Sequence, residues 1–183
     1  MKKLSMDELN RLSPEEFKSA TKSKVVIILD NIRSMHNVGS VFRTADAFAV
    51  EKIILCGITA CPPHRDIEKS ALGATASVEW EYEAQTLDAV HKLQQKGYKV
   101  LAIEQTENSA ELQKFEFNYH DSYAIVFGNE VEGVQQEVID ACEGCIEIPQ
   151  FGTKHSFNVS VTAGIVMWQV FTSHLKTKDY KNA

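Results

Sequence analysis

Three short segments combine glycine, asparagine, serine, arginine and glutamate with apolar residues directly after strand-like runs. The first, NIRSMHNVGSVFRTADAF, spans residues 31–48; the second, AIVFGNEVEG, spans residues 124–133; and the third, IPQFGTKHSFNVSVTAG, spans residues 148–164. Polar residues at strand ends are where α/β proteins build binding sites. These segments therefore hold the candidate site residues.

Arg43 is the first candidate for catalysis. It lies on a predicted amphipathic helix among small and apolar residues, in the stretch NVGSVFR. Asn37 lies six positions earlier, less than two helical turns away, so both side chains could approach one cleft at the start of the helix. An arginine in such surroundings often pairs with a carboxylate, and Asp46 at i+3 is a local partner. On the residues alone, a structural ion pair and a catalytic role both stay open.

The second segment predicts a tight loop after a buried strand. Gly128 follows the apolar run AIVF and Gly133 lies five residues later, and glycine lets backbone groups approach a ligand closely. The common phosphate-binding patterns G-x-G-x-x-G and Walker A are absent from the sequence. Glu130 could hold Arg43 or help to place a substrate, or it could be an acid stabilised by a helix N-terminus. Asn129 could cap the turn.

The third segment offers both apolar and polar candidates. Ile148 and Phe157 could sandwich a planar base while loop backbone groups read its edge, or they could pack in the core. Ser156 and Asn158 could orient a ribose by hydrogen bonding, and either could also cap the terminal helix. His155 precedes Ser156, but neighbours in sequence rarely adopt base–nucleophile geometry and no G-x-S-x-G is present, so hydrolysis is disfavoured.

The elements that must position these residues alternate along the chain. Strands are predicted at residues 24–29, 52–55, 78–82, 98–103, 122–127 and 145–148, and helices at residues 6–20, 37–48, 66–72, 86–95, 109–115, 135–141 and 158–175. Such alternation predicts a mostly parallel sheet covered by helices. Trp80 and Tyr82, on one face of a predicted strand, are expected to pack in the core.

Composition indicates one globular domain. The chain has 183 residues, of which 44% are hydrophobic and 24% charged, as in ordinary globular proteins. No apolar run approaches the length of a membrane span, and the N-terminus lacks the apolar stretch of a signal peptide, so we expect a cytoplasmic protein. Four cysteines, Cys56, Cys61, Cys142 and Cys145, could bind zinc. Idle thiols in a reducing compartment are the preferred interpretation, and no metal is predicted.

The charge distribution gives a mixed signal about nucleic acid. The net charge of −6 disfavours a generic nucleic-acid binder, yet residues 1–24 and 174–183 are slightly basic while the body is acidic. Both ends could hold RNA phosphates or could be solvated faces. The same two interpretations apply to the scattered basic residues Arg33, His36, His64, Arg65 and Lys69.

Together the three segments resemble the signature motifs of the SpoU/TrmH family of RNA ribose 2′-O-methyltransferases, in the SPOUT superfamily. The resemblance runs from about residue 24 to residue 175, in the family's order. It implies an α/β fold with a mostly parallel, helix-covered sheet and a C-terminal trefoil knot over roughly residues 123–175. It also divides the chain into a helical extension (1–23), a methyltransferase domain (24–175) and a short basic tail (176–183).

The resemblance implies methyl transfer from S-adenosylmethionine to a ribose 2′-hydroxyl, with S-adenosylhomocysteine as the product. By motif position, the catalytic set is Arg43, Asn37, Glu130, Ser156 and Asn158. The cofactor-binding set is Gly128, Ile148, Phe157 and Glu104. In the family, the arginine at the position of Arg43 activates the hydroxyl. Arginine holds its proton tightly, so stabilisation of developing alkoxide charge is favoured and a role as general base stays open.

The implied partners are RNA and a second copy of the chain. A compact domain with short tails favours tRNA modestly over rRNA. The terminal helix is apolar on more than one face, which is compatible with the homodimer that the resemblance implies. No membrane partner is expected. Two alternatives stay open: a non-catalytic RNA-binding or assembly factor that retains the fold, and a SPOUT methyltransferase that modifies a base.

Overall fold

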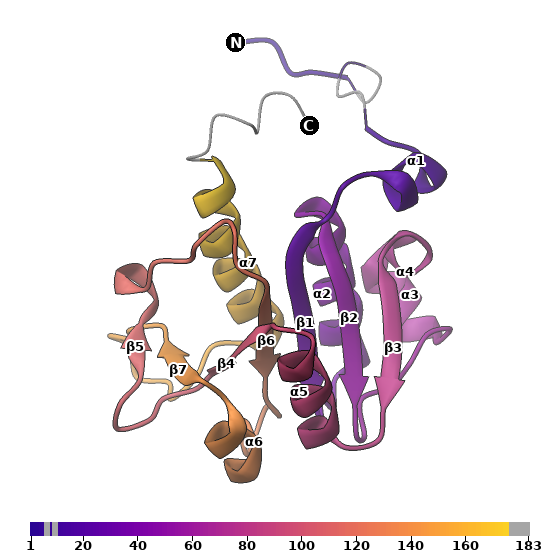
Figure 1. Cartoon of the computed structure of the whole chain (residues 1–183). Helices are drawn as coiled ribbons and strands as arrows, with labels where there is room; N and C mark the ends of the chain where they lie inside the picture. The colour runs from indigo at the N-terminus through magenta and orange to yellow at the C-terminus, as the bar shows by residue number, and fades with distance from the viewer. Residues whose placement is uncertain (6–7, 9–10, 176–183) are drawn as a thin grey trace.

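The computed structural model describes residues 1–5, 8 and 11–175. Its centre is a seven-stranded sheet in which every pair of neighbouring strands is parallel, in the order β3-β2-β1-β6-β4-β7-β5 (Figure 1). The strands are β1 (Ser23–Asp30), β2 (Val50–Cys56), β3 (Glu79–Glu83), β4 (Lys99–Ile103), β5 (Ala110–Glu111), β6 (Tyr123–Phe127) and β7 (Gly144–Glu147). The predicted α/β architecture is confirmed.

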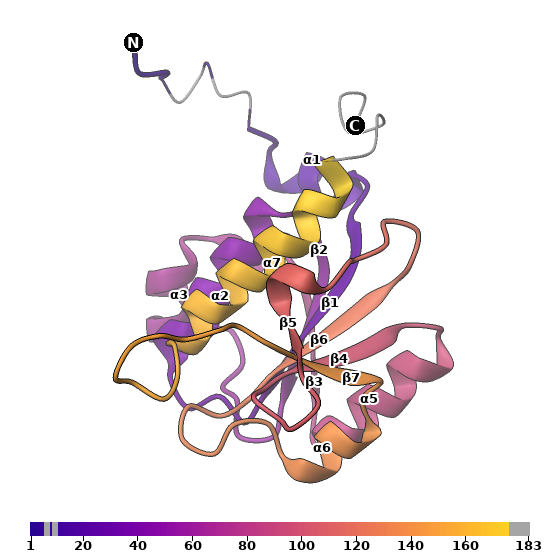
Figure 2. The same cartoon turned by 90° about the vertical axis from the view of Figure 1, so that its left-hand side faces the viewer.

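Helices cover both faces of this sheet. They are α1 (Pro14–Ser19), α2 (Met35–Ala47), α3 (Arg65–Ala71), α4 (Ala74–Ser77), α5 (Thr86–Gln95), α6 (Gln136–Ala141) and α7 (Val159–Leu175), with a 3₁₀ turn, η2, at Leu112–Lys114. Figure 2 shows α2, α3 and α7 on one side of the sheet and α5 and α6 on the other. The site is therefore built on a three-layer scaffold.

Two cores follow from the alternation of side chains along the buried strands. In β1, Ile27 and Leu29 face the core shared with α2, α3 and α7, whereas Val26 and Ile28 face the core shared with α5 and α6. Residues 25–30 of β1 are all buried, because strands on both sides and helices on both faces enclose them. This explains the continuous apolar run that ends at a charged residue, Asp30.

Two sequence predictions are wrong in part. Residues 109–115, predicted as a helix, instead contain β5, which pairs with β7 at the sheet edge, followed by η2. Sheet pairing here overrides the local pattern. The predicted helix at residues 6–20 forms only as α1 within the described residues, because Ser13 caps it and Pro14 opens it. Residues 6, 7, 9 and 10 and the predicted tail at 176–183 lie outside the described residues. The trefoil knot stays a prediction.

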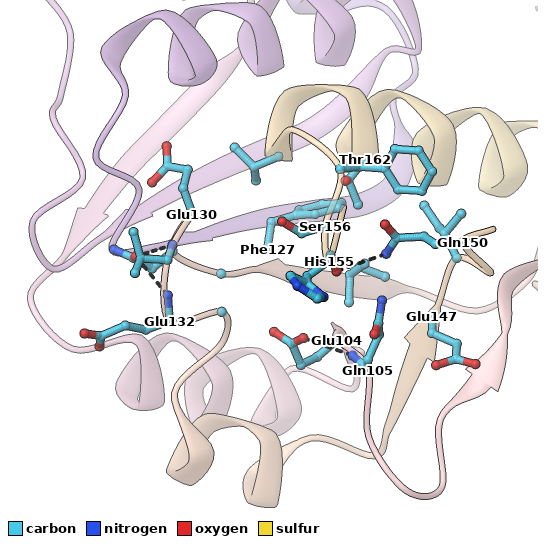
Figure 3. Close-up of a pocket in the computed structure, with 18 of the residues that line it drawn as sticks. Glu104, Gln105, Phe127, Glu130, Glu132, Glu147, Gln150, His155, Ser156 and Thr162 are labelled. Atoms are coloured by element: carbon cyan, nitrogen blue, oxygen red, sulfur yellow. Dashed lines mark hydrogen bonds between the residues drawn. The ribbon is translucent and has the colours of Figure 1, made fainter. Parts of the chain in front are cut away.

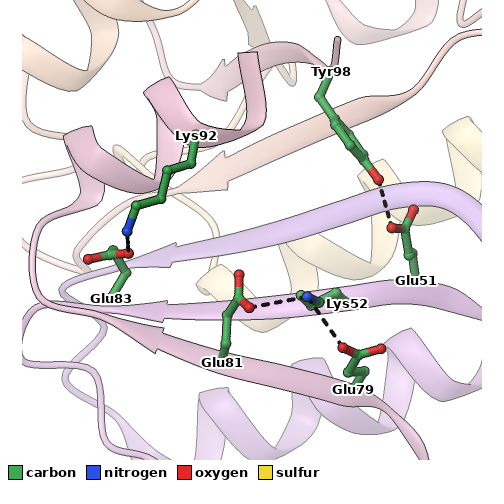
Figure 4. Close-up of polar contacts among 7 residues, drawn as sticks. All are labelled: Glu51, Lys52, Glu79, Glu81, Glu83, Lys92 and Tyr98. Atoms are coloured by element: carbon green, nitrogen blue, oxygen red, sulfur yellow. Dashed lines mark hydrogen bonds and ion pairs between the residues drawn. The ribbon is translucent and has the colours of Figure 1, made fainter. Parts of the chain in front are cut away.

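The exposed edge strand β3 is protected by charge. Lys52 of β2 lies 3.3 Å from Glu79 and 3.1 Å from Glu81, and Lys92 of α5 pairs with Glu83 (Figure 4). Charged side chains on an edge strand oppose pairing with another chain. Of the two aromatic residues of β3, Trp80 packs against the core as predicted. Tyr82 does not, because its side chain is 52% exposed and its hydroxyl donates to the Gly57 carbonyl.

Within the described part of the chain, the helices are too short or too polar to cross a membrane.

Candidate functional site

A cavity of about 300 Å³ lies at the carboxyl ends of β4, β6 and β7, beside the start of α7 (Figure 3). Its walls come from the end of β4, the loop after β6 and the segment that joins β7 to α7. These are the second and third candidate segments, together with Glu104 and Gln105. The carboxyl ends of parallel strands open into such crevices because the connecting loops diverge there.

The loop after β6 is shaped by two glycines. A Cβ atom on Gly128 would lie 2.2 Å from the Gly133 carbonyl carbon and from the Val134 nitrogen, and Gly133 has a φ of +72°. The Asn129 and Gly133 backbones exchange two hydrogen bonds of 2.9 Å, which close the loop on itself. Side chains are thereby excluded from the place where the backbone folds over, and the loop presents backbone groups to the cavity.

Glu104 lines the cavity and also holds this loop. One carboxylate oxygen accepts a 3.0 Å hydrogen bond from the Val134 backbone N–H, and the other accepts one of 3.0 Å from Gln105. Glu104 thus ties the loop after β6 to the end of β4. Its predicted place beside a bound molecule agrees with this geometry, and its contact with the loop is an additional role.

The two apolar candidates of the third segment both line the cavity but differ in burial. Ile148 is half-buried and packs against the core, so the interpretation as a core residue also describes it. Phe157 is 42% exposed. Core packing does not explain an aromatic side chain this exposed. An aromatic ring at the wall of a cavity can cover a planar ligand.

The three candidate segments join through one chain of hydrogen bonds beside this cavity. Asn37 Nδ2 donates to Glu130 Oε1 at 3.0 Å, and Asn158 Nδ2 donates to Asn37 Oδ1 at 3.0 Å. Glu130, Asn37 and Asn158 come from the loop after β6, from α2 and from the residue before α7. The structure therefore brings together one catalytic candidate from each segment.

Glu130 also serves the start of α2. Its carboxylate accepts from the backbone N–H groups of Arg33 at 3.0 Å and Ser34 at 3.1 Å. Glu130 is thus an acid at a helix N-terminus, but the helix is α2 and not the one that follows it in sequence. Partial burial raises the pKa of Glu130, but hydrogen bonds from Arg33, its own N–H, Asn37 and Ser34 outweigh this and lower the pKa below its ordinary value.

Two capping predictions are confirmed. Asn129 Oδ1 accepts from the N–H groups of Val131 and Glu132, as in an Asx turn. Asn158 Oδ1 accepts from the Ser160 N–H at 2.9 Å, so Asn158 caps α7 while its amide nitrogen reaches Asn37. The structural and the predicted site roles of Asn158 are therefore compatible.

Arg43 and Ser156 stand apart from this hydrogen-bond chain. Arg43 is exposed on α2, and its side chain has no hydrogen bond or ion pair within the described residues. Its expected partner Asp46 instead accepts a hydrogen bond from Ser77, so the predicted ion pair does not form. Ser156 is exposed and lines the cavity (Figure 3). The Arg43 side chain is thus available to bind an anionic group of a ligand.

Asp30 and Asn31 contact the loop after β6, and sequence reasoning did not single out either of them, although Asn31 begins the first candidate segment. Asp30 is fully buried at the end of β1, and Asn31 has a φ of +55°. The available signal was a charged residue that ends the apolar run KVVIIL and is followed by asparagine, a residue that tolerates the left-handed region. Their contacts to the loop after β6 join segments about a hundred residues apart and have no local signature.

The cysteines do not form a metal site in the described part of the chain, where no cluster of three or more potential ligands occurs. Burial raises the pKa of Cys56 and of Cys142 to about 12, so both stay protonated thiols near neutral pH.

Comparison with known proteins identifies related chains. The model of the SpoU rRNA Methylase family matches residues 24–168. The 23S rRNA (guanosine-2′-O-)-methyltransferase RlmB of Neisseria meningitidis serogroup B is 33% identical over 143 residues, which cover 78% of this chain and 56% of that protein. This chain spans roughly three fifths of the length of the relatives that it matches.

Solved structures agree in fold. The TrmH/SpoU tRNA modifying enzyme of A. aeolicus superposes with a TM-score of 0.79 at 23% identity, over 92% of this chain and 83% of that one. An AdoMet-bound rRNA methyltransferase from Sinorhizobium meliloti superposes with a TM-score of 0.77 at 25% identity, over 91% of this chain and 62% of that one.

Proposed function

The chain belongs to the SpoU rRNA Methylase family, and from this premise we propose that it transfers a methyl group from S-adenosylmethionine to a ribose 2′-hydroxyl of RNA. The observation that carries the proposal is the hydrogen-bond chain Glu130–Asn37–Asn158, which unites the three candidate segments beside one cavity. The relative RlmB is named as a guanosine-2′-O-methyltransferase, which supports the same chemistry here.

The cavity fits the proposed cofactor. The loop from Gly128 to Gly133 lines the cavity, and its closed shape requires glycine at position 128, where a Cβ would meet the Gly133 and Val134 backbone. Ile148 and Phe157 would cover the adenine, whose edge the loop backbone would read. When bound, S-adenosylmethionine supplies an electrophilic methyl group on a sulfonium. AdoMet was solved in the S. meliloti relative, which supports this assignment.

Arg43 supplies the positive charge that the reaction needs at the ribose. A 2′-hydroxyl loses its proton as it attacks, and negative charge develops on its oxygen. Arginine is a poor general base but a good electrostatic stabiliser, so we infer that Arg43 fixes an adjoining phosphate and stabilises the developing alkoxide. Its lack of a partner within the described residues leaves it available for this task.

We infer that polar residues of the three segments orient the substrate. Ser156 lines the cavity, and Asn37 and Asn158 belong to the hydrogen-bond chain that reaches the cavity at Glu130. These groups would hold the ribose by hydrogen bonds, and Glu130 would fix the orientation of Asn37. The methyl group then moves from sulfur to oxygen, a proton is released, and S-adenosylhomocysteine leaves.

A homodimer is part of the proposal. On α7 an apolar face is left uncovered by the described chain, with Val161 50%, Trp168 51% and Leu175 39% exposed. Exposed apolar residues that recur along one helix are typical of an interface. A second copy of the chain would cover this face and place its own surface beside the cavity, near the start of α7.

RNA is the proposed substrate, with tRNA favoured over rRNA because a compact structured RNA can rest on a dimer's own surface. The substrate named for RlmB is 23S rRNA, so both pools are tested. The cytoplasm, where both RNAs reside, is the proposed location.

The test is methyl transfer from labelled S-adenosylmethionine to tRNA and, separately, to rRNA, each prepared from a host that lacks this gene. We expect label in one pool, and we expect it in tRNA. Label in rRNA alone would reverse the preference but keep the activity. No label in either pool, with S-adenosylhomocysteine binding intact, would contradict a stand-alone enzyme and favour a non-catalytic RNA-binding role.

A further inference from the structure

Asp30 is a fully buried carboxylate whose partners come from three parts of the chain. One oxygen accepts from Thr86 Oγ1 at 2.5 Å and from Asn31 Nδ2 at 2.8 Å, and the other accepts from the Gln135 backbone N–H at 3.2 Å. Its side chain has no basic partner among the residues that the structure describes. A buried carboxylate without a basic partner depends on such hydrogen-bond donors, so each donor that it loses costs stability.

Asn31 extends this network. Its side-chain oxygen accepts from the Ile58 N–H at 3.1 Å, and its carbonyl accepts from Asn129 Nδ2 at 2.7 Å. Asn31 is held in the left-handed region with a φ of +55°. Gly57 also has a positive φ, and a Cβ there would lie 2.1 Å from Asn31 Oδ1. The neighbouring loop is therefore shaped around the Asn31 side chain, and a strained residue of this kind is kept only where its surroundings fix it.

The loop after β6 is therefore held from two sides. From β1, Asn31 binds its start through Asn129, and Asp30 binds its end through Gln135. From β4, Glu104 binds the Val134 N–H. The two attachments differ in position: Glu104 lines the cavity, whereas neither Asp30 nor Asn31 does. Figure 3 shows Glu104 and Glu130 on opposite sides of this loop.

The β1 attachment controls the side of the loop that carries Glu130. Asn129, which Asn31 holds, directly precedes Glu130, and Glu130 binds residues 33–37, which directly follow Asn31. A shift at Asn31 would therefore move both partners of the Glu130–Asn37 hydrogen bond. Asn129 and Glu130 line one part of the cavity, whereas the part at Glu104 and Gly133, which the Glu104–Val134 hydrogen bond ties to β4, would keep its position.

We propose that Asp30 and Asn31 are a pair of positioning residues. They hold the hydrogen-bonded residues Glu130, Asn37 and Asn158 where these can bind the ribose, and they do not affect cofactor binding. Neither residue touches the substrate. The proposal rests on the methyltransferase function proposed above. It assigns the two attachments of one loop to two different tasks: Glu104 serves the cofactor, and the β1 pair serves the substrate.

The test compares Asn31→Gly with Glu104→Gln. Glycine keeps the left-handed backbone but removes every side-chain contact of Asn31. Glutamine keeps the size of Glu104 but sets an amide N–H against a backbone N–H. Two quantities are measured: the Kd for S-adenosylhomocysteine by calorimetry, and the single-turnover methylation rate, at saturating S-adenosylmethionine, of the RNA pool that the wild type labels.

We expect opposite results for the two variants. Asn31→Gly should lower the rate by about tenfold or more and change the Kd by less than about threefold, and Glu104→Gln should do the reverse. Asn129→Asp is the second test of the β1 attachment. It keeps the acceptor of the Asx turn and loses the donor to Asn31. Because Asn129 also lines the cavity, only its methylation rate is compared, and this rate should fall as expected for Asn31→Gly.

Thr86→Val is the control for a merely structural role. It removes the Thr86 donor to Asp30 but leaves the donors from Asn31 and Gln135 in place, so it should lower the melting temperature and leave both measured quantities unchanged. The proposal is overturned if Asn31→Gly raises the Kd as much as it lowers the rate, if Asn129→Asp leaves the rate unchanged, or if Thr86→Val lowers the rate as much as Asn31→Gly does. An inactive wild type would instead contradict the proposed methyltransferase function. Failure of that function can therefore be distinguished from failure of the positioning role.

Discussion

The Arg43 guanidinium is exposed and has no partner within the described residues, so its substitution should affect the reaction and not the fold. Arg43→Ala is expected to lower the methylation rate by about 10²–10³-fold, the usual effect of removing a group that stabilises developing negative charge. The methylation rate of Arg43→Lys should lie between those of the wild type and Arg43→Ala, since lysine keeps the charge but loses the planar guanidinium group. Single-turnover rates at saturating cofactor, with melting temperatures as the folding control, check this prediction. An unchanged rate in Arg43→Ala would remove Arg43 from the mechanism.

Glu130 predicts a pH dependence of stability. Partial burial opposes ionisation, but the hydrogen bonds from Arg33, its own N–H, Asn37 and Ser34 prevail and lower its folded-state pKa below the ordinary value of 4.5. The unfolded chain therefore takes up the proton first as the pH falls. The stabilisation is present above the unfolded pKa and is lost as the pH falls through the folded pKa. Thermal melts of wild type and Glu130→Gln should differ near neutral pH and converge in acid.

Glu132→Gln is the matched control for that experiment. Glu132 lies in the same loop, and its side chain has no hydrogen bond in the described part of the chain. Its melting temperature should follow that of the wild type at every pH. A gap between wild type and Glu130→Gln that widened in acid would contradict the assigned direction of the pKa shift.

Polar residues after parallel strands predicted a site at one edge of the sheet, and the family resemblance named the residues of a catalytic set, of which the structure joins three by hydrogen bonds while Arg43 and Ser156 stand apart. The three are Asn37, Glu130 and Asn158. The sequence could not show that Glu130 serves α2, because the helix it was expected to serve follows it directly and α2 lies far away in the chain. It could not show that Asp46 binds Ser77 in place of Arg43, because that contact depends on the packing of α2 against α4.

The exposed apolar face of α7 predicts the oligomeric state. Trp168 is 51% exposed and packs only partly, against Phe48 and Phe171. A carboxylate in the middle of a buried interface would be desolvated without a partner. We therefore expect Trp168→Asp to convert a dimer into a monomer of 20.5 kDa in light scattering coupled to size exclusion. Leu72→Asp, at a site that is 67% exposed beyond the end of α3, should stay dimeric. A monomeric wild type at micromolar concentration would contradict the dimer.

The basic residues of α3 indicate part of the surface that we expect RNA to contact. Arg65 and Lys69 are exposed, lie one turn apart, and form no ion pair with other described residues. α3 packs closely on α2 at Gly39, which places these cations on the same layer as Arg43. Removing two phosphate contacts should lower the slope of log affinity against log salt by about 1.5. The measurement is binding of the double variant Arg65→Ala/Lys69→Ala to the methylated RNA pool over a range of salt.

The control for α3 lies on the opposite face of the sheet. Lys92 and Lys96 have the same spacing at the end of α5 (Figure 2). Lys92→Ala/Lys96→Ala should leave the salt slope unchanged. Equal effects of the two double variants would mean that RNA responds to overall charge and not to a path over α3.

At the scale of the whole molecule, the sequence was enough to predict the class of the fold but not the order of its strands. Apolar runs such as KVVIIL and AIVF, separated by amphipathic stretches, predicted a mostly parallel sheet covered by helices. The strand order β3-β2-β1-β6-β4-β7-β5 could not be derived in this way, because the pairings β1–β6, β6–β4, β4–β7 and β7–β5 join strands that are not consecutive in the chain. For the same reason β5 was mistaken for a helix: its two residues are extended only because β7 lies beside them. The resemblance to a known family, and not periodicity, connected this scaffold with methyl transfer.

The chemical position of the transferred methyl group tests the central claim most directly. RNA from a host lacking this gene would be incubated with the protein and labelled S-adenosylmethionine, then hydrolysed in alkali. A 2′-O-methyl group blocks attack on the adjoining phosphodiester. We therefore expect label in alkali-resistant dinucleotides that yield 2′-O-methyl nucleosides on nuclease digestion. Label in mononucleotides that carry a methylated base would contradict it and identify a base-modifying enzyme.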